Sequence, residues 1–247
     1  MSTSRPVAII GEANSYSGPA LALEMARRGH DVVLGDASSG LVEQINALGA
    51  RAVDVTGTNH LLDAKDSQRL VDAALAEFGR LDSATTATGI IVVGRFLKSS
   101  VNDLHKALQG CVEVPYHFLR AVVPAMVERG AGQVLIQTSA SGARVTPGAP
   151  LYSTARAAAN HLVKNVAAEV AHTGVQVNAV GTNFMDFPGF LAANGVVDEE
   201  SRKRVESQVP MKRLGNIEEF ANFCANFIDG SFTFTTGQFV SYSGGWS

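Results

Sequence analysis

Three side chains near the middle of the sequence are of types that could together transfer a proton. Ser139 ends the apolar run QVLIQTS, which is typical of a buried strand, while Tyr152 and Arg156 lie early in a long helical pattern. Residues four apart share one face of a helix, and open parallel sheets bind ligands at the carboxyl ends of their strands. A neighbouring positive charge lowers the pKa of a phenol, whose ordinary value of about 10 is too high for a base at neutral pH. The pattern therefore predicts a proton-transfer site with Tyr152 as the base.

Each of these residues also has a more ordinary interpretation. A serine after a strand is usually a turn or cap residue, a tyrosine on a helix usually packs, and Arg156 could be a surface charge. Taken singly, the residues favour those interpretations. Their spacing, directly after a buried strand, makes us favour the catalytic one.

The size, charge and cysteine content of the chain restrict its class. The chain has 247 residues and a formal net charge of −3, which gives no reason to expect nucleic acid or a membrane as a partner. No apolar run approaches the ~20 residues that span a bilayer, and the start MSTSRPVAII shows no secretory signal. Cys111 and Cys224 lack metal-ligand spacing, so we expect no metal and a reduced, cytoplasmic protein.

Strand-like and helix-like patterns alternate along the chain. Apolar strand patterns cover 7–11, 30–36, 50–55, 81–86, 133–139, 175–181 and 237–243, and helical patterns cover 18–29, 41–48, 67–78, 102–129 and 151–172. Pro115 and Pro124 should kink or interrupt the longest helix. The alternation predicts the α/β class, with a single Rossmann-like domain over residues 1–247. Its doubly wound parallel sheet should have about seven strands flanked by helices.

Over essentially its full length, the chain resembles the short-chain dehydrogenase/reductase superfamily. It shares a dinucleotide-type opening, a serine before a tyrosine on a helix, and an ending of the form GQ…GG. Members that transfer hydride carry a glycine-rich turn after the first strand, an Asn-Asn-Ala-Gly motif after the fourth, and Tyr-x-x-x-Lys. This sequence departs from all three motifs.

The departures fall on residues that would contact a nicotinamide cofactor. The turn GEANSYSG places Tyr16 where backbone must approach a pyrophosphate, although Asp36 ends the second strand where an acid would hold a ribose hydroxyl. The segment SATTATG has no asparagine pair, and Cys111 lies about where relatives carry a relay asparagine. Arg156 replaces the lysine, with which arginine is not interchangeable. We interpret these differences as a site without nicotinamide, so no cofactor is expected.

One branch of the superfamily, the halohydrin dehalogenases, is similar in its motifs. That branch carries Ser, a Tyr thirteen residues later and an Arg four residues after it, as Ser139, Tyr152 and Arg156 do. In the turn after the first strand, that branch carries an aromatic residue followed by a glycine, as Tyr16 and Gly18 do here. Gly11 stands where the branch has a threonine. The resemblance implies a cofactor-independent carbon–halide lyase that converts a haloalcohol to an epoxide and halide, and opens epoxides with small anions. It also implies a homotetramer paired through helices 102–129 and 151–172.

The loop TNFMDFPGF after the sixth strand predicts a pocket beside the proton-transfer site. Backbone amides ringed by aromatic side chains would suit a weakly hydrated anion, and an ordinary apolar lid over a substrate is the alternative. The resemblance favours a halide or substrate pocket formed by Tyr16, Thr182, Asn183, Phe184, Met185 and Phe187.

Two other functions stay open. An NAD(P)-dependent short-chain oxidoreductase would have to tolerate arginine at position 156 and an aromatic residue in the glycine turn. A non-catalytic relative would be expected to lose its proton-relay residues, yet all three are in place.

Overall fold

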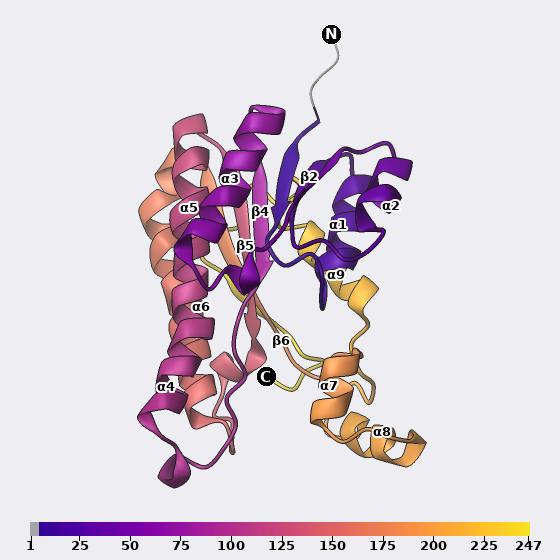
Figure 1. The fold of residues 1–247 in the computed structure, drawn as a ribbon. Coiled ribbons are helices and arrows are strands. Elements are labelled where there is room, and N and C mark those ends of the chain that lie inside the picture. Colours follow the sequence, from indigo (N-terminus) through magenta and orange to yellow (C-terminus); the bar gives the residue numbers. More distant parts are fainter. Residues whose placement is uncertain (1–4) are drawn as a thin grey trace.

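One sheet of seven strands forms the centre of the molecule (Figure 1). The computed structural model describes residues 5–247. The expectation of no secretory signal depends in part on residues 1–4, which lie outside this range. The strands are β1 (Val7–Ile10), β2 (Asp31–Gly35), β3 (Ala52–Val55), β4 (Ser83–Ala87), β5 (Gly132–Ser139), β6 (Val175–Thr182) and β7 (Phe239–Tyr242). Their spatial order is β3-β2-β1-β4-β5-β6-β7, and all pairs are parallel. The predicted doubly wound α/β fold is confirmed.

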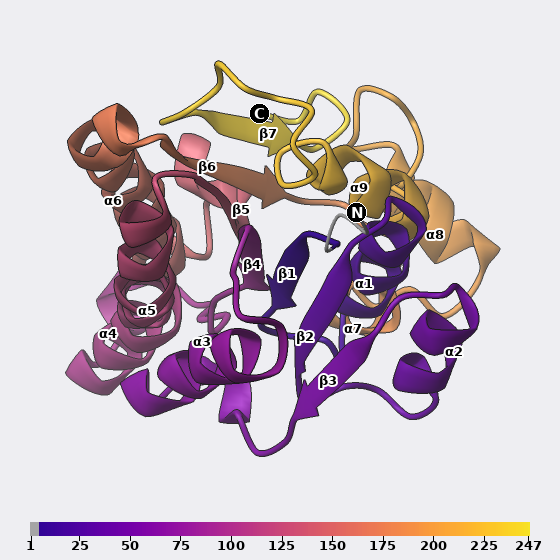
Figure 2. The same ribbon diagram turned by 90° about the horizontal axis from the view of Figure 1, so that it is seen from above.

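Helices cover both faces of the sheet (Figure 2). They are α1 (Gly18–Arg27), α2 (Leu41–Ala47), α3 (Ala64–Phe78), α4 (Val101–Leu108), α5 (Val114–Arg129), α6 (Pro150–Val170), α7 (Pro188–Ala193), α8 (Glu199–Glu206) and α9 (Ile217–Ala225). Alternate residues of each strand serve the two faces: Ile9 packs under α3, α5 and α6, and Ile10 packs under α1, α2 and α9. The strand order reverses between β1 and β4, so the crevice at their carboxyl ends is where a ligand is expected.

The predicted helix over 102–129 is divided, as its prolines suggested. A π-helical turn, Gln109–Glu113, separates α4 from α5, and Pro115 lies in the first turn of α5. A proline ring clashes with the carbonyl four residues earlier, here that of Cys111, and a wider turn relieves that clash. Pro124 stays inside α5 without ending it.

The start of α3 differs from the predicted start because of an N-cap residue. Helix α3 begins at Ala64 rather than at Ser67, because the side chain of Asp63 accepts a hydrogen bond of 3.0 Å from the amide of Lys65. An N-cap of this kind satisfies one of the free amides at a helix start.

Two further expectations concern partners. No helix within residues 5–247 is long and apolar enough to cross a bilayer. The homotetramer implied by the resemblance, paired through α4–α5 and α6, stays a prediction that light scattering would test.

Candidate active site

The structure brings the predicted proton-transfer residues to the carboxyl end of the sheet. Ser139 is the last residue of β5 and pairs in register with Thr182 of β6. Tyr152 and Arg156 lie in the first two turns of α6, which follows. All three side chains are buried, with 6% of Ser139, 9% of Tyr152 and 4% of Arg156 exposed. The site is therefore shielded from bulk water.

Ser139 has a structural role as well as a place in the site. It caps the short turn Ala140–Ala143, because its Oγ accepts a hydrogen bond of 3.2 Å from the amide of Ser141. The same Oγ lies 3.1 Å from Oγ of Ser141 and 3.4 Å from the carbonyl oxygen of Thr182. These contacts fix the serine hydroxyl at the strand end, where it can donate to a substrate oxygen.

Arg156 is a buried cation without an acidic partner among the described residues. Its guanidinium carbon lies 5.0 Å from the ring centroid of Tyr152. Nη1 donates to Oγ1 of Thr88 at 2.9 Å, and Nη2 donates to the carbonyl of the same residue. The contact requires Gly89, since a Cβ there would lie 1.9 Å from Nη2. A fixed positive charge of this kind stabilises negative charge that develops on a nearby oxygen.

Tyr152 packs in a small apolar cluster that includes Cys111. Sγ of Cys111 is 3.9 Å from the carbonyl oxygen of Ile90, and burial raises the pKa of this thiol. Cys111 thus lies beside Tyr152, near the place where relatives carry an asparagine. No hydrogen bond within residues 5–247 engages the Tyr152 hydroxyl, which leaves that group available to a substrate.

Tyr16 reaches from the first turn into the same site. Its hydroxyl donates a hydrogen bond of 2.7 Å to Oγ1 of Thr182, and its ring contacts Phe187 at 4.8 Å between centroids. Burial raises the pKa of Tyr16, and the hydrogen bond to Thr182 offsets this only in part. The ring of Tyr16 therefore stands between the turn after β1 and the end of β6.

Sequence reasoning missed Glu12, which lies in the same turn. Its side chain is buried, and its Oε2 is 2.8 Å from Nδ1 of His60. Burial raises the pKa of the Glu12 carboxyl. The turn closes tightly over this residue, because a Cβ at Gly18 would lie 1.8 Å from the Glu12 carbonyl oxygen. The sequence did contain a signal for Glu12, because an acidic residue is unusual in a turn that corresponds to a phosphate-binding turn.

Asp36 uses its carboxylate within the protein. It accepts hydrogen bonds from the amides of Gly57, Thr58 and Asn59 and from the hydroxyl of Thr58. Burial alone would raise the pKa of Asp36, but these hydrogen bonds outweigh it and hold the pKa below its usual value. To bind a ribose, as the sequence suggested, Asp36 would have to exchange some of these hydrogen bonds for bonds from the ribose hydroxyls.

The turn as described does not fit a dinucleotide. A pyrophosphate needs bare backbone amides and no anionic neighbour there, whereas the turn carries the Glu12 carboxylate and the Tyr16 ring. Both side chains would have to leave their positions before a dinucleotide could occupy the crevice.

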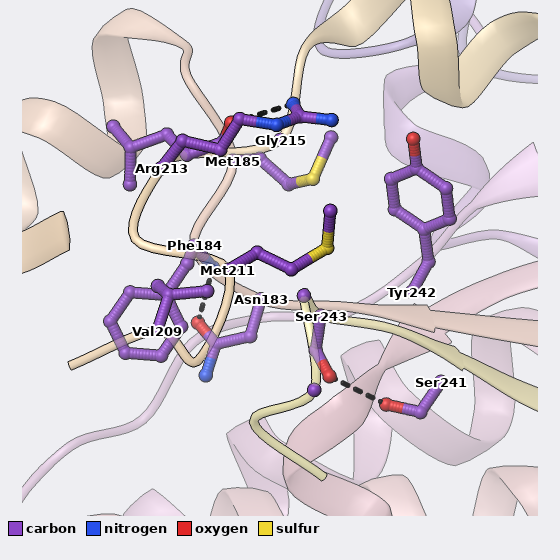
Figure 3. Close-up of a pocket in the computed structure, with 13 residues that line it drawn as sticks. Asn183, Phe184, Met185, Val209, Met211, Arg213, Gly215, Ser241, Tyr242 and Ser243 are labelled. Carbon is purple, nitrogen blue, oxygen red and sulfur yellow. Dashed lines mark hydrogen bonds between the residues drawn. The ribbon is translucent and has the colours of Figure 1, made fainter. Parts of the chain in front are cut away.

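The predicted pocket residues separate into two groups. Tyr16, Thr182 and Phe187 meet one another beside the buried trio. In contrast, Asn183, Phe184 and Met185 line a cavity of about 300 Å³ between the end of β6 and the segments 209–215 and 241–245 (Figure 3). Phe184 adopts a left-handed backbone, with φ of 56°, so the chain turns at that residue.

Three backbone amides of the loop predicted to hold an anion are engaged within the protein. The amide of Phe184 donates to Oδ1 of Asn183 at 2.9 Å. The amides of Asp186 and Phe187 donate to the carbonyls of Gly215 and Met185. These three amides already donate within the protein and are not available to a halide, whereas the predicted pocket as a whole stays a prediction.

Comparison with known proteins assigns the chain to a family. Residues 11–247 match the family model described as Enoyl-(Acyl carrier protein) reductase. An uncharacterized oxidoreductase of Thermotoga maritima is 30% identical, over 97% of this chain and 96% of its own length. A 2,5-dichloro-2,5-cyclohexadiene-1,4-diol dehydrogenase of Sphingobium indicum is also 30% identical, over 98% and 96%. The crystal structure of levodione reductase superposes with a TM-score of 0.85 at 25% identity, covering 98% of this chain and 97% of that one.

The fold and the serine–tyrosine site thus define a protein of the short-chain dehydrogenase/reductase superfamily. Within it, the chain belongs to the family described as Enoyl-(Acyl carrier protein) reductase.

These findings overturn the function predicted from the motifs. The named relatives are dehydrogenases and reductases, and none is a halohydrin dehalogenase. The predictions of a carbon–halide lyase and of haloalcohol-to-epoxide conversion are therefore wrong. The relatives support the alternative that we kept, a short-chain oxidoreductase.

Proposed function

We propose that this protein is an oxidoreductase that interconverts an alcohol and a carbonyl compound, with Tyr152 as its acid–base group. The observation that carries the proposal is the burial of Ser139 at the end of β5 and of Tyr152 and Arg156 at the start of α6, with the Arg156 guanidinium beside the Tyr152 ring. Membership of an oxidoreductase family supports the same reaction class.

Three residues of this chain have different roles at the substrate oxygen. The Tyr152 hydroxyl donates its proton to a carbonyl oxygen on reduction and takes it back from the alcohol on oxidation. The Ser139 hydroxyl, held by Ser141, donates a second hydrogen bond to the same oxygen. Arg156 supplies fixed positive charge where negative charge develops.

The surroundings indicate the kind of substrate. The catalytic side chains are buried, and Tyr152 packs among apolar neighbours that include Cys111 and Ala155. A desolvated site of this kind favours a small, mainly apolar compound with one oxygen to be held.

The family resemblance implies a nicotinamide dinucleotide as the hydride partner, and binding it would require the side chains of Glu12 and Tyr16 to leave the crevice. Turnover with a panel of ketones and secondary alcohols, followed by dinucleotide absorbance, tests the proposal directly. We expect turnover of at least one pair, which the variant Tyr152→Phe should lose. A complete absence of turnover with NAD(H) and NADP(H), across aliphatic, cyclic and aromatic compounds, would contradict it.

A further inference from the structure

The C-terminal tail makes two different contacts near the active site. The indole of Trp246 meets the ring of Phe184 edge to face, with 5.6 Å between centroids. On another side, the guanidinium carbon of Arg144 lies 4.4 Å from the indole centroid, and Nη1 of Arg144 donates a hydrogen bond of 2.7 Å to the Trp246 carbonyl. The tail is therefore fixed between these two residues.

Arg144 connects the tail to the segment that carries the catalytic serine and tyrosine. It follows directly after the turn Ala140–Ala143 that Ser139 caps. Its carbonyl accepts a hydrogen bond of 3.1 Å from Oγ of Ser153, the residue next to Tyr152. A displacement of Arg144 would therefore move both ends of the loop between β5 and α6.

Phe184 connects the tail to the end of β6. It lies two residues after Thr182, whose carbonyl oxygen is 3.4 Å from Oγ of Ser139. Phe184 and Trp246 also pack in an apolar cluster with Val205, Val209, Leu214, Phe190 and Leu191. The α7–α8 segment is therefore attached to the tail through the same contact.

These contacts close a ring on one side of the active site. The ring runs from Ser139 to Thr182 and Phe184, across to Trp246 and Arg144, and back through Ser153 and Ser141 to Ser139. Ser139 belongs to this ring and Tyr152 adjoins it through Ser153, so a substrate whose oxygen they hold has the ring beside it. Arg144 is an exposed residue, so its contact with Trp246 is the link most easily opened.

We propose that Arg144 and Trp246 are specificity-determining residues, which form one wall of the substrate site and limit the size of the substituent next to the reacting carbon. The proposal rests on the proposed function, since it concerns the alcohol or carbonyl compound held at Tyr152.

The single tryptophan of the chain allows a direct test of the contact. In Arg144→Ala, the fluorescence of Trp246 should shift to longer wavelength, and its quenching by acrylamide should rise about twofold, because one face of the indole gains solvent. The matched control is Arg51→Ala, which removes an equivalent cation–π contact, at 4.7 Å over Phe78, on a distant part of the fold. That control should leave Trp246 fluorescence unchanged, and circular dichroism should show both variants folded.

Size selection is measured by calorimetry with two probes, 2-butanol and 1-phenylethanol. In Arg144→Ala the dissociation constant of the larger alcohol, divided by that of the smaller, should fall by about three- to fivefold. The reason is that a wall that has lost a cation–π contact excludes the larger alcohol less strongly. Arg144→Lys, which keeps the charge, should fall between wild type and alanine. Arg51→Ala should keep the wild-type ratio.

Binding needs no turnover, so these measurements separate the inference from the proposed reaction. Unchanged Trp246 fluorescence in Arg144→Ala would show that the contact does not hold the tail. An unchanged binding ratio would show that the tail does not bound the substrate site. Either result overturns the inference, even for an enzyme that reduces ketones, whereas both expected changes would support it in a protein that shows no redox turnover.

Discussion

The hydroxyl of Tyr16 donates a hydrogen bond of 2.7 Å to Oγ1 of Thr182, and so joins the turn after β1 to the end of β6. This bond crosses the crevice in which relatives of the fold would hold a dinucleotide. The Tyr16 backbone has φ of 52°, a conformation that favours glycine. A residue of glycine-like geometry therefore carries an aromatic ring into the crevice.

Tyr16→Gly should increase the affinity for a nicotinamide dinucleotide, because it removes the ring and keeps a residue suited to this backbone. We expect a decrease in the dissociation constant of about tenfold or more, or ~1.4 kcal/mol, in a fluorescence titration with NADH and NADPH. Tyr16→Phe, which loses only the bond to Thr182, is the control and should change it little. Equal affinities in wild type and Tyr16→Gly would show that the ring does not obstruct binding.

Arg156→Lys should slow the reaction while leaving the fold intact. Lysine keeps the charge but loses the planar fork that donates to both oxygens of Thr88. We expect kcat to fall about tenfold or more for Arg156→Gln, which removes the charge, and by less for Arg156→Lys. If kcat is the same in all three proteins, Arg156 does not stabilise the reacting charge.

Glu12→Gln should stabilise the protein at neutral pH. Burial raises the pKa of Glu12 above its usual 4.5, so the folded state holds this proton to higher pH than the unfolded state does. Stability is therefore lost as the pH rises through the folded pKa, and below 4.5 the acid costs nothing. The melting temperatures of wild type and variant should agree at low pH and diverge above it, by ~2–4 °C for each 1 kcal/mol. A constant difference across pH would place the effect in packing rather than in ionisation.

Cys111 and Cys224 should resist thiol reagents in the folded protein. Both are buried, and burial raises the pKa of each thiol, so little thiolate is present at neutral pH. With Ellman's reagent, we expect slow reaction of the native protein and rapid reaction of both thiols after unfolding. Fast reaction of one thiol under native conditions would show that its surroundings open readily.

Much of the fold could be predicted because it depends on local pattern. Apolar strand runs and helical periodicity placed all seven strands, and Pro115 marked the division of the longest helix. The sequence pattern placed Ser139 at a strand end and Tyr152 and Arg156 in the first turns of the next helix, because both elements follow from local pattern.

Contacts between distant segments could not be predicted in this way. Glu12 meets His60 through a turn in which His60 adopts a left-handed backbone, with φ of 55°, and no periodicity in the sequence indicates that turn. The predicted pocket residues separate because the chain turns at Phe184, where φ is 56°. The halohydrin dehalogenase prediction depended on the spacing of Ser139, Tyr152 and Arg156, whereas similarity along the whole chain indicates an oxidoreductase.

The most direct test compares two tyrosines of one site, each with its hydroxyl removed. Tyr152→Phe and Tyr16→Phe lose the same atom, but only the Tyr152 hydroxyl is free of protein partners within the described residues and is assigned to proton transfer. The measurement is the rate of ketone reduction by NADH or NADPH at saturating substrate in wild type and both variants. We predict that Tyr152→Phe lowers the rate about 10²–10⁴-fold and that Tyr16→Phe keeps most of it. A Tyr152→Phe enzyme that reduces ketones at nearly the wild-type rate would contradict the account.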